Sequence, residues 1–139
     1  MKKFNFKATL LVACVGTLGL GSLLMSAMPG SDIMTKEGKT TIINTTLLGK
    51  NVRGFKGQTP VKIYITDNKI QKIEALKNQD TPQFFNKAKA LLEKFEGKSV
   101  KKAANLQVDA VSGATYSSKA LKKNVELGLE YYQKHKSQI

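Results

Sequence analysis

A single change of hydrophobic period, near residue 80, constrains the fold of this chain more than any other feature. Before it, residues 61–66 alternate between apolar and polar or amphipathic side chains, which is the period of a half-buried strand. The polar residues 67–69 predict a tight turn into a second strand over about 70–77, so the pair should form an antiparallel hairpin. The β-branched segment 40–48 predicts one more strand. This part of the chain therefore indicates a small antiparallel sheet.

After this point the period is helical. Thr81 is a suitable N-cap, Pro82 suits the first helical position, and Gly97 is a suitable stop. The predicted apolar face of this helix consists of Phe84, Ala88, Leu91, Leu92 and Phe95. A second helix is predicted over about 116–134, with Leu121, Val125, Leu129 and Tyr132 on one face. The predicted fold class is therefore α+β: a small antiparallel sheet with two amphipathic helices, in one domain over residues 40–139.

Residues 1–30 form a separate unit that predicts a membrane anchor. The 21 residues from Ala8 to Met28 carry no charge, and as a helix they would span about 31 Å, enough for a bilayer core of roughly 30 Å. Three lysines and no acidic residue precede this segment, which predicts that the N-terminus stays in the cytoplasm. We expect a domain on the extracytoplasmic side of the cytoplasmic membrane, joined to its anchor by the polar linker 31–39.

Two other interpretations of the N-terminal segment stay open. A cleaved signal peptide needs two small residues spaced A-x-A, but Ala27 is preceded two positions earlier by the bulky Met25. A lipoprotein signal would place the lipid on Cys14, although only a short apolar run precedes that cysteine and the apolar segment continues past it. All three interpretations export the domain.

The single cysteine and the single histidine, His135, exclude several kinds of site. One cysteine forms no disulfide framework within the chain, no zinc ribbon and no CxxC redox pair. One histidine near the end of the chain argues against a histidine-based metal site or a catalytic triad. We therefore expect no catalytic residues and no metal ligands, and redox chemistry would need a bound cofactor.

The charge pattern argues against nucleic acid as a partner. Basic residues outnumber acidic ones by 23 to 10, yet only Arg53 is an arginine, and recognition of phosphates and bases by two parallel hydrogen bonds relies on arginine. The first 28 residues hold three basic residues and no acidic one, so residues 29–139 carry a formal net charge of +10. A lysine-rich exported surface is suited to anionic lipid headgroups, cell-wall polymer or an acidic partner.

Residues 109–118 are small or hydroxylated and lead into the last predicted helix. Unpaired N–H groups and the helix dipole make such a helix start a favourable place for an anion. Gly113 permits a tight turn and a close approach to a ligand, and Thr115 is a suitable N-cap whose hydroxyl would lie beside these donors. On residue types alone, an ordinary Ser/Thr-capped helix after a glycine turn is the favoured interpretation. A Walker A loop is excluded, because Lys119 lacks the glycine that should precede it.

This segment resembles the D-x-x-S/T-G-A-S/T flavinylation motif of the FMN-binding domain family. In this chain the motif is Asp109, Ala110, Val111, Ser112, Gly113, Ala114 and Thr115. Such domains occur in the C subunit of the sodium-translocating quinone reductase, in the G subunit of the related ion-translocating electron-transport complex, and in small exported flavoproteins. The resemblance extends to the glycine-aromatic-x-glycine segment 54–57, the following hairpin and the acidic-Thr-Pro segment 80–82, and covers about residues 40–130.

The resemblance implies that FMN is bound covalently, through its phosphate, to the hydroxyl of Thr115. A separate magnesium-dependent flavin transferase would install it from FAD. Asp109 would be a recognition or loop-orienting residue, while Gly113 and the neighbouring amides of Ser112 and Ala114 would surround the phosphate. Thr81 is a candidate for lining the flavin ring, by position only.

The chain departs from the family pattern after Pro82. The family often continues with glycines there, whereas this chain has Gln83, Phe84 and Phe85. This difference leaves the shape of the outer flavin pocket open. Phe84 or Phe85 could stack on the ring, although for Phe84 we expect packing in the core.

The expected function is that of an exported, membrane-associated flavoprotein that relays electrons. A covalent bond keeps the cofactor on a protein facing a large outside volume, where a dissociable ligand would be lost. The chain has no acid–base pair of its own, so we expect an electron carrier rather than an enzyme with its own substrate. Its expected partners are the flavin transferase and membrane redox proteins, namely a quinone reductase, pump subunits or a terminal reductase. A peripheral flavin subunit of an ion-translocating complex and a non-redox exported binding module are the alternatives.

Overall fold

The computed structural model describes residues 33–138 and confirms the α+β class. The apolar segment 8–28, and with it the expected anchor or signal helix, lies outside the described residues. Among the helices of residues 33–138, none combines the length and the apolar character that a bilayer crossing requires.

The sheet has four antiparallel strands in the order β1-β2-β3-β4. They are β1 (Met34–Glu37), β2 (Thr40–Asn44), β3 (Val61–Thr66) and β4 (Lys69–Ala75). The predicted hairpin of β3 and β4 is present, and its turn residues Asp67 and Asn68 have φ values of 52° and 59°, as a tight type I′ turn requires. Strand β1 lies within the range 31–39, where the sequence predicted only a linker. Its side chains are mostly exposed, so its pairing with β2 leaves little apolar signal in the sequence.

The helical part differs from the prediction in four respects. The predicted helix over 82–97 is α2 (Pro82–Lys89) followed by the 3-10 helix η1 (Ala90–Lys94), and a short helix α3 (Val100–Ala104) follows that the sequence did not predict. The last helix, α4 (Thr115–His135), begins one residue earlier than predicted. Phe85, not Phe84, is the first buried residue of the apolar face, because Phe84 is only half-buried.

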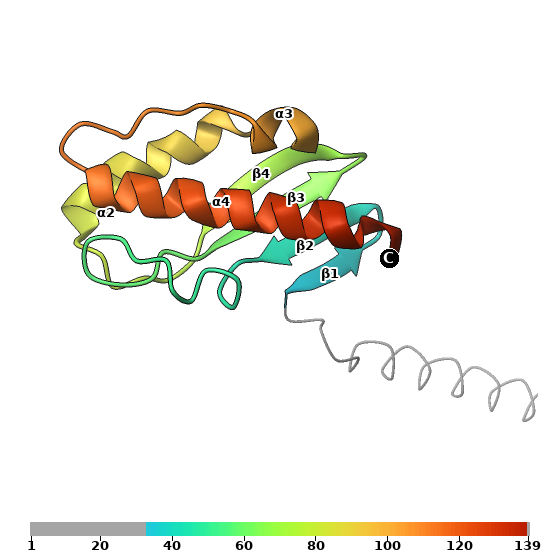
Figure 1. Ribbon diagram of the computed structural model, residues 1–139, viewed down its shortest axis with the longest axis horizontal. Coiled ribbons are helices and arrows are strands. Elements are labelled where there is room, and N and C mark those ends of the chain that lie inside the picture. Colours follow the sequence, from blue (N-terminus) through green and yellow to red (C-terminus); the bar gives the residue numbers. More distant parts are fainter. Residues whose placement is uncertain (1–32, 139) are drawn as a thin grey trace, which may run out of the picture. The chain divides into compact units, whose positions relative to one another are not determined.

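Helix α4 lies across one face of the sheet, as Figure 1 shows, and it contacts β2 and β3. Its four predicted core residues, Leu121, Val125, Leu129 and Tyr132, are all buried. The helix approaches the sheet closely at Gly128, where an added Cβ would lie 2.6 Å from Ile63 Cδ1 and 3.0 Å from Thr45 Cγ2. The glycine is therefore required by packing and not by backbone conformation.

We expect Gly128→Val to destabilise the domain by about 1–3 kcal/mol, because the added side chain overpacks the interface between helix and sheet. The matched control is Lys123→Val, which places the same side chain at an exposed position of α4. Urea unfolding of both variants measures the difference. Equal stability of the two variants would contradict the close approach.

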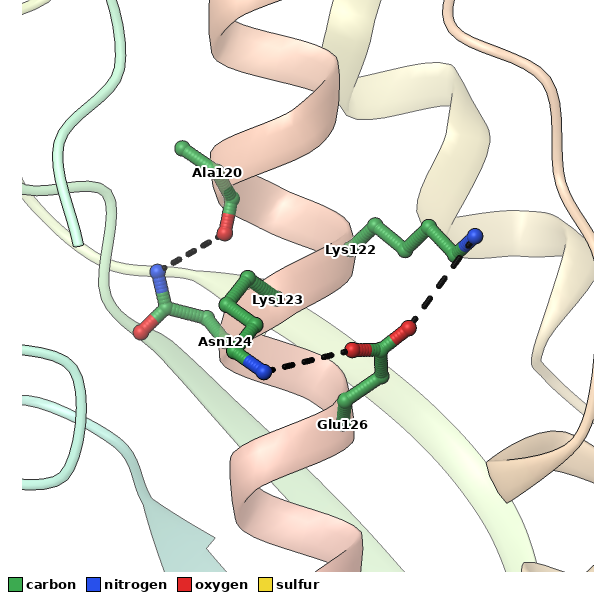
Figure 2. Close-up of polar contacts among 5 residues, drawn as sticks. All are labelled: Ala120, Lys122, Lys123, Asn124 and Glu126. Carbon is green, nitrogen blue, oxygen red and sulfur yellow. Dashed lines mark hydrogen bonds and ion pairs between the residues drawn. The ribbon is translucent and has the colours of Figure 1, made fainter.

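Polar side chains lie on two sides of α4, as Figure 2 shows. On the exposed side, Lys122 and Lys123 pair with Glu126 at 4.0 and 3.8 Å, and such surface pairs contribute little to stability. On the other side, Asn124 is 1% exposed and its Nδ2 donates to Ala120 O at 3.0 Å. Its Oδ1 faces Gly49, where a Cβ would lie only 2.0 Å away. The buried amide therefore fits because residue 49 has no side chain.

Candidate functional site

The start of α4 is formed by a turn over residues 111–114. Ala114 N donates to Val111 O at 2.9 Å, and Gly113 has a φ of +78°, which is the conformation that glycine adopts readily in such turns. The N-cap is the buried Ala114, without a side-chain capping bond. The prediction of Thr115 as N-cap is therefore wrong by one residue: Thr115 is the first helical residue and its side chain is exposed.

The four serine and threonine residues between positions 112 and 118 fall into two pairs. Ser117 and Ser118 are each 1% exposed. The Ser117 hydroxyl donates to Asp80 Oδ2 at 2.5 Å, and Ser118 Oγ accepts from Val111 N at 3.0 Å. Ser112 and Thr115 are exposed. An enzyme acting on this segment from outside therefore meets two of the four hydroxyl groups.

The surroundings of Thr115 favour an anion. The first N–H groups of α4, at Thr115, Tyr116 and Ser117, have no carbonyl partner within the helix, and the helix dipole adds positive potential there. Lys87 of α2 adds a full charge, because its Nζ lies 4.0 Å from the point where a Cβ of Gly113 would be. These donors suit a phosphate group held beside Thr115.

An aromatic pocket of about 230 Å³ opens beside these donors. It is lined by Phe55, Phe84 and the five residues 113–117. The centroid of the Phe55 ring lies 5.8 Å from that of the Phe84 ring and 6.3 Å from that of the Tyr116 ring. Phe55 and Tyr116 are 54% and 68% exposed, which is unusual for large aromatic side chains. The pocket offers flat apolar surfaces to a planar aromatic ligand.

Asp80 holds the walls of this pocket together. Asp80 is 5% exposed, and its carboxylate accepts hydrogen bonds from the N–H groups of Phe55, Lys56 and Gly57, at 3.1, 2.7 and 3.1 Å. The fourth hydrogen bond comes from Ser117. Burial opposes the charged form of Asp80, but the hydrogen bonds from Ser117 and the loop outweigh it and hold the pKa below its ordinary value of 3.8. The carboxylate is therefore ionised at neutral pH.

Sequence reasoning did not identify Asp80 as a site residue. The chain shows it only as the acidic residue of an acidic-Thr-Pro segment, and its partners lie 23 to 37 residues away. A second signal is Gly54, where an added Cβ would lie 2.2 Å from Asp80 Oδ2. This contact explains the first glycine of the 54–57 segment, because any other side chain would displace the carboxylate.

The predicted site residues are distributed around this arrangement. Gly113, Ala114 and Thr115 line the aromatic pocket, and Ser112 is exposed on the turn beside it. Asp109 is exposed on the loop between α3 and α4. Thr81 is the N-cap residue of α2; its carbonyl accepts from the N–H groups of Phe84 and Phe85, and its side chain makes no capping bond. Thr81 is not among the residues that line the pocket.

Residues 54–130 match the family of the FMN-binding domain. The match covers more than half of the chain and includes both the 54–57 loop and the start of α4. The chain therefore belongs to the FMN-binding domain family, and FMN is its cofactor. No curated protein matches the chain significantly.

Proposed function

We propose that this protein is an exported flavoprotein that carries FMN covalently on Thr115 and relays electrons at the cytoplasmic membrane. The observation that carries the proposal is the position of the Thr115 hydroxyl. It is exposed at the first residue of α4, between the free N–H groups of that helix and the aromatic pocket. FMN supplies one- and two-electron transfer when bound, and the protein supplies its position and electrostatic surroundings.

The phosphate and the ring of the flavin would each meet suitable groups on the protein. The first N–H groups of α4 and the Lys87 ammonium would hold the phosphate, and Gly113 leaves room for it. The rings of Phe55, Phe84 and Tyr116 would pack against the isoalloxazine ring. In the attachment reaction a bond forms between Thr115 Oγ1 and the FMN phosphorus of FAD. The pyrophosphate bond breaks, AMP leaves, and the hydroxyl proton passes to the transferase or to solvent.

The attachment is tested by the intact mass of the protein after co-expression with a flavin transferase and supply of FAD and Mg²⁺. We expect the mass to rise by one FMN less one water. An unmodified mass under these conditions, with a known substrate of the same transferase modified in parallel, would refute the proposal. Visible absorbance of the purified protein separates this function from that of a non-redox binding module.

Asp109 serves attachment more than folding in this proposal. Its side chain is exposed, and the turn after it is held by other groups, with Ser118 Oγ accepting from Val111 N. We expect Asp109→Asn to lower flavin incorporation steeply while the free energy of unfolding changes by less than about 0.5 kcal/mol. Mass spectrometry and thermal unfolding of the same sample measure both quantities. Normal incorporation with a large fall in melting temperature would make Asp109 a structural residue.

The proposed location follows from the uncharged segment 8–28 behind three lysines. We expect a C-terminal tag to be removed when protease is added to intact spheroplasts, because the domain lies outside the cytoplasmic membrane. A cytoplasmic protein serves as the control for lysis. Protection of the tag in intact spheroplasts would reverse the topology.

The proposed partners are the flavin transferase and a membrane redox protein such as a quinone reductase, pump subunits or a terminal reductase. If the domain is a peripheral subunit of an ion-translocating complex, integral pump subunits should co-purify with it from mild detergent. A free electron carrier should instead purify without them and be reduced in intact membranes.

A further inference from the structure

The buried carboxylate of Asp80 lies between the two sides of the proposed flavin site. On one side are the N–H groups of residues 55–57, and on the other is the hydroxyl of Ser117, two residues after the attachment position. We propose that Asp80 is a positioning residue for the flavin ring, because it holds the Phe55 wall in register with the start of α4. This inference rests on the proposed function.

Among the hydrogen bonds of the described residues, those of Asp80 alone link the 54–57 loop, which carries Phe55, to α4. Residues 54–57 close on themselves through the bond from Gly54 N to Gly57 O at 2.7 Å, while three successive N–H groups of this segment point to the Asp80 carboxylate. Hydrogen bonds to a charged acceptor are among the stronger ones in proteins. The place of the Phe55 ring beside Phe84 and Tyr116 is therefore set by a residue that does not itself line the pocket.

The chain carries further evidence that this contact is close. Gly54 cannot be replaced without displacing the carboxylate, since its Cβ would lie 2.2 Å from Asp80 Oδ2. The Ser117 hydroxyl, at 2.5 Å, ties the first turn of α4 to the same oxygen atom. A shift of Asp80 would therefore move the ring wall and the attachment position relative to each other.

The test uses the full chain loaded with FMN by the flavin transferase and measures the fluorescence anisotropy of the flavin. A ring held between aromatic side chains turns with the protein, whereas a ring held only by its phosphate turns independently. We expect Asp80→Asn to lose as much anisotropy as Phe55→Ala does, with FMN still on Thr115 by intact mass. The double variant should lose no more than either single variant, because both changes remove the same wall.

Two further variants keep the test decisive. If Asp80→Asn fails to fold, Gly54→Ala takes its place in the test. The added methyl group pushes the loop away from the unchanged Asp80 carboxylate and should give the same loss of anisotropy. Gly128→Val serves as the control for destabilisation, since it lies about 20 Å along α4 from Thr115 and should leave the anisotropy unchanged.

Unchanged anisotropy in loaded Asp80→Asn or Gly54→Ala would overturn the inference and leave Asp80 with a structural role alone. If the losses of anisotropy add up in the double variant, the inference that Asp80 acts through Phe55 is wrong. A wild-type chain that carries no flavin would instead refute the proposed function, so the two failures are distinguishable.

Discussion

Thr115→Ala should abolish covalent flavin attachment, with no shift in intact mass and no flavin fluorescence of the denatured band in a gel. The variant lacks the hydroxyl that would form the phosphodiester, and the other exposed candidate of the segment, Ser112, lies on the preceding turn. The fold should be unaffected, because the Thr115 side chain is exposed and makes no capping bond. A fluorescent Thr115→Ala band would move the attachment to another residue.

Two matched variants separate the hydroxyl from the surrounding motif. Thr115→Ser keeps an alcohol at the first position of α4 and should retain attachment, whereas Thr115→Val keeps the shape of threonine and should lose it. Ser112→Ala tests the second exposed hydroxyl and should retain the full mass shift. Loss of attachment in Ser112→Ala with retention in Thr115→Val would assign the bond to Ser112.

Asp80→Ala should cause the largest loss of stability among the changes at this site. The substitution leaves the buried Gly57 N–H and the Ser117 hydroxyl without their acceptor, and each hydrogen bond to a charged group is worth about 1.5–3 kcal/mol. Because the neighbouring N–H groups gain some contact with water, we expect a net cost of about 2–4 kcal/mol. For a domain of this size the melting temperature should fall by roughly 10–20 °C.

The same carboxylate predicts a dependence on pH. The pKa of Asp80 is lower in the folded protein than its ordinary value of 3.8, so its contribution to stability is complete above the unfolded pKa and is lost as the pH falls through the lower folded pKa. The stability difference between wild type and Asp80→Asn should be largest at neutral pH and should shrink below about pH 4. A pH-independent difference would mean that the charge of Asp80 does not matter.

Much of the fold follows from local periodicity. The alternation over 61–66, the turn at Asp67 and Asn68, and the apolar face of α4 each lie within one continuous segment, and the structure confirms all three. The motif over 109–115 is also continuous, so its resemblance to the FMN-binding domain family was visible in the chain, and the family match over residues 54–130 confirms it. Turn chemistry and helical period act between near neighbours, and for that reason they can be predicted from sequence.

The elements that the sequence did not reveal depend on pairing or packing with distant segments. Strand β1 is mostly polar and exists through its register with β2, and the helix predicted over 82–97 changes to a 3-10 helix at Ala90. Phe85 takes the core position that was predicted for Phe84. Phe84 instead lines the pocket beside Phe55, which comes from a different loop.

The sequence by itself determined the fold class, the family and the short segment that holds the proposed attachment residue. The tertiary structure alone decided which hydroxyl groups of that segment are accessible and what the pocket beside them is made of. Asp80 contributes to both, because its hydrogen bonds reach 25 residues back to Phe55 and 37 residues forward to the buried Ser117 hydroxyl. A carboxylate with such distant partners has no periodicity and no local motif, so only the folded chain reveals which groups it joins.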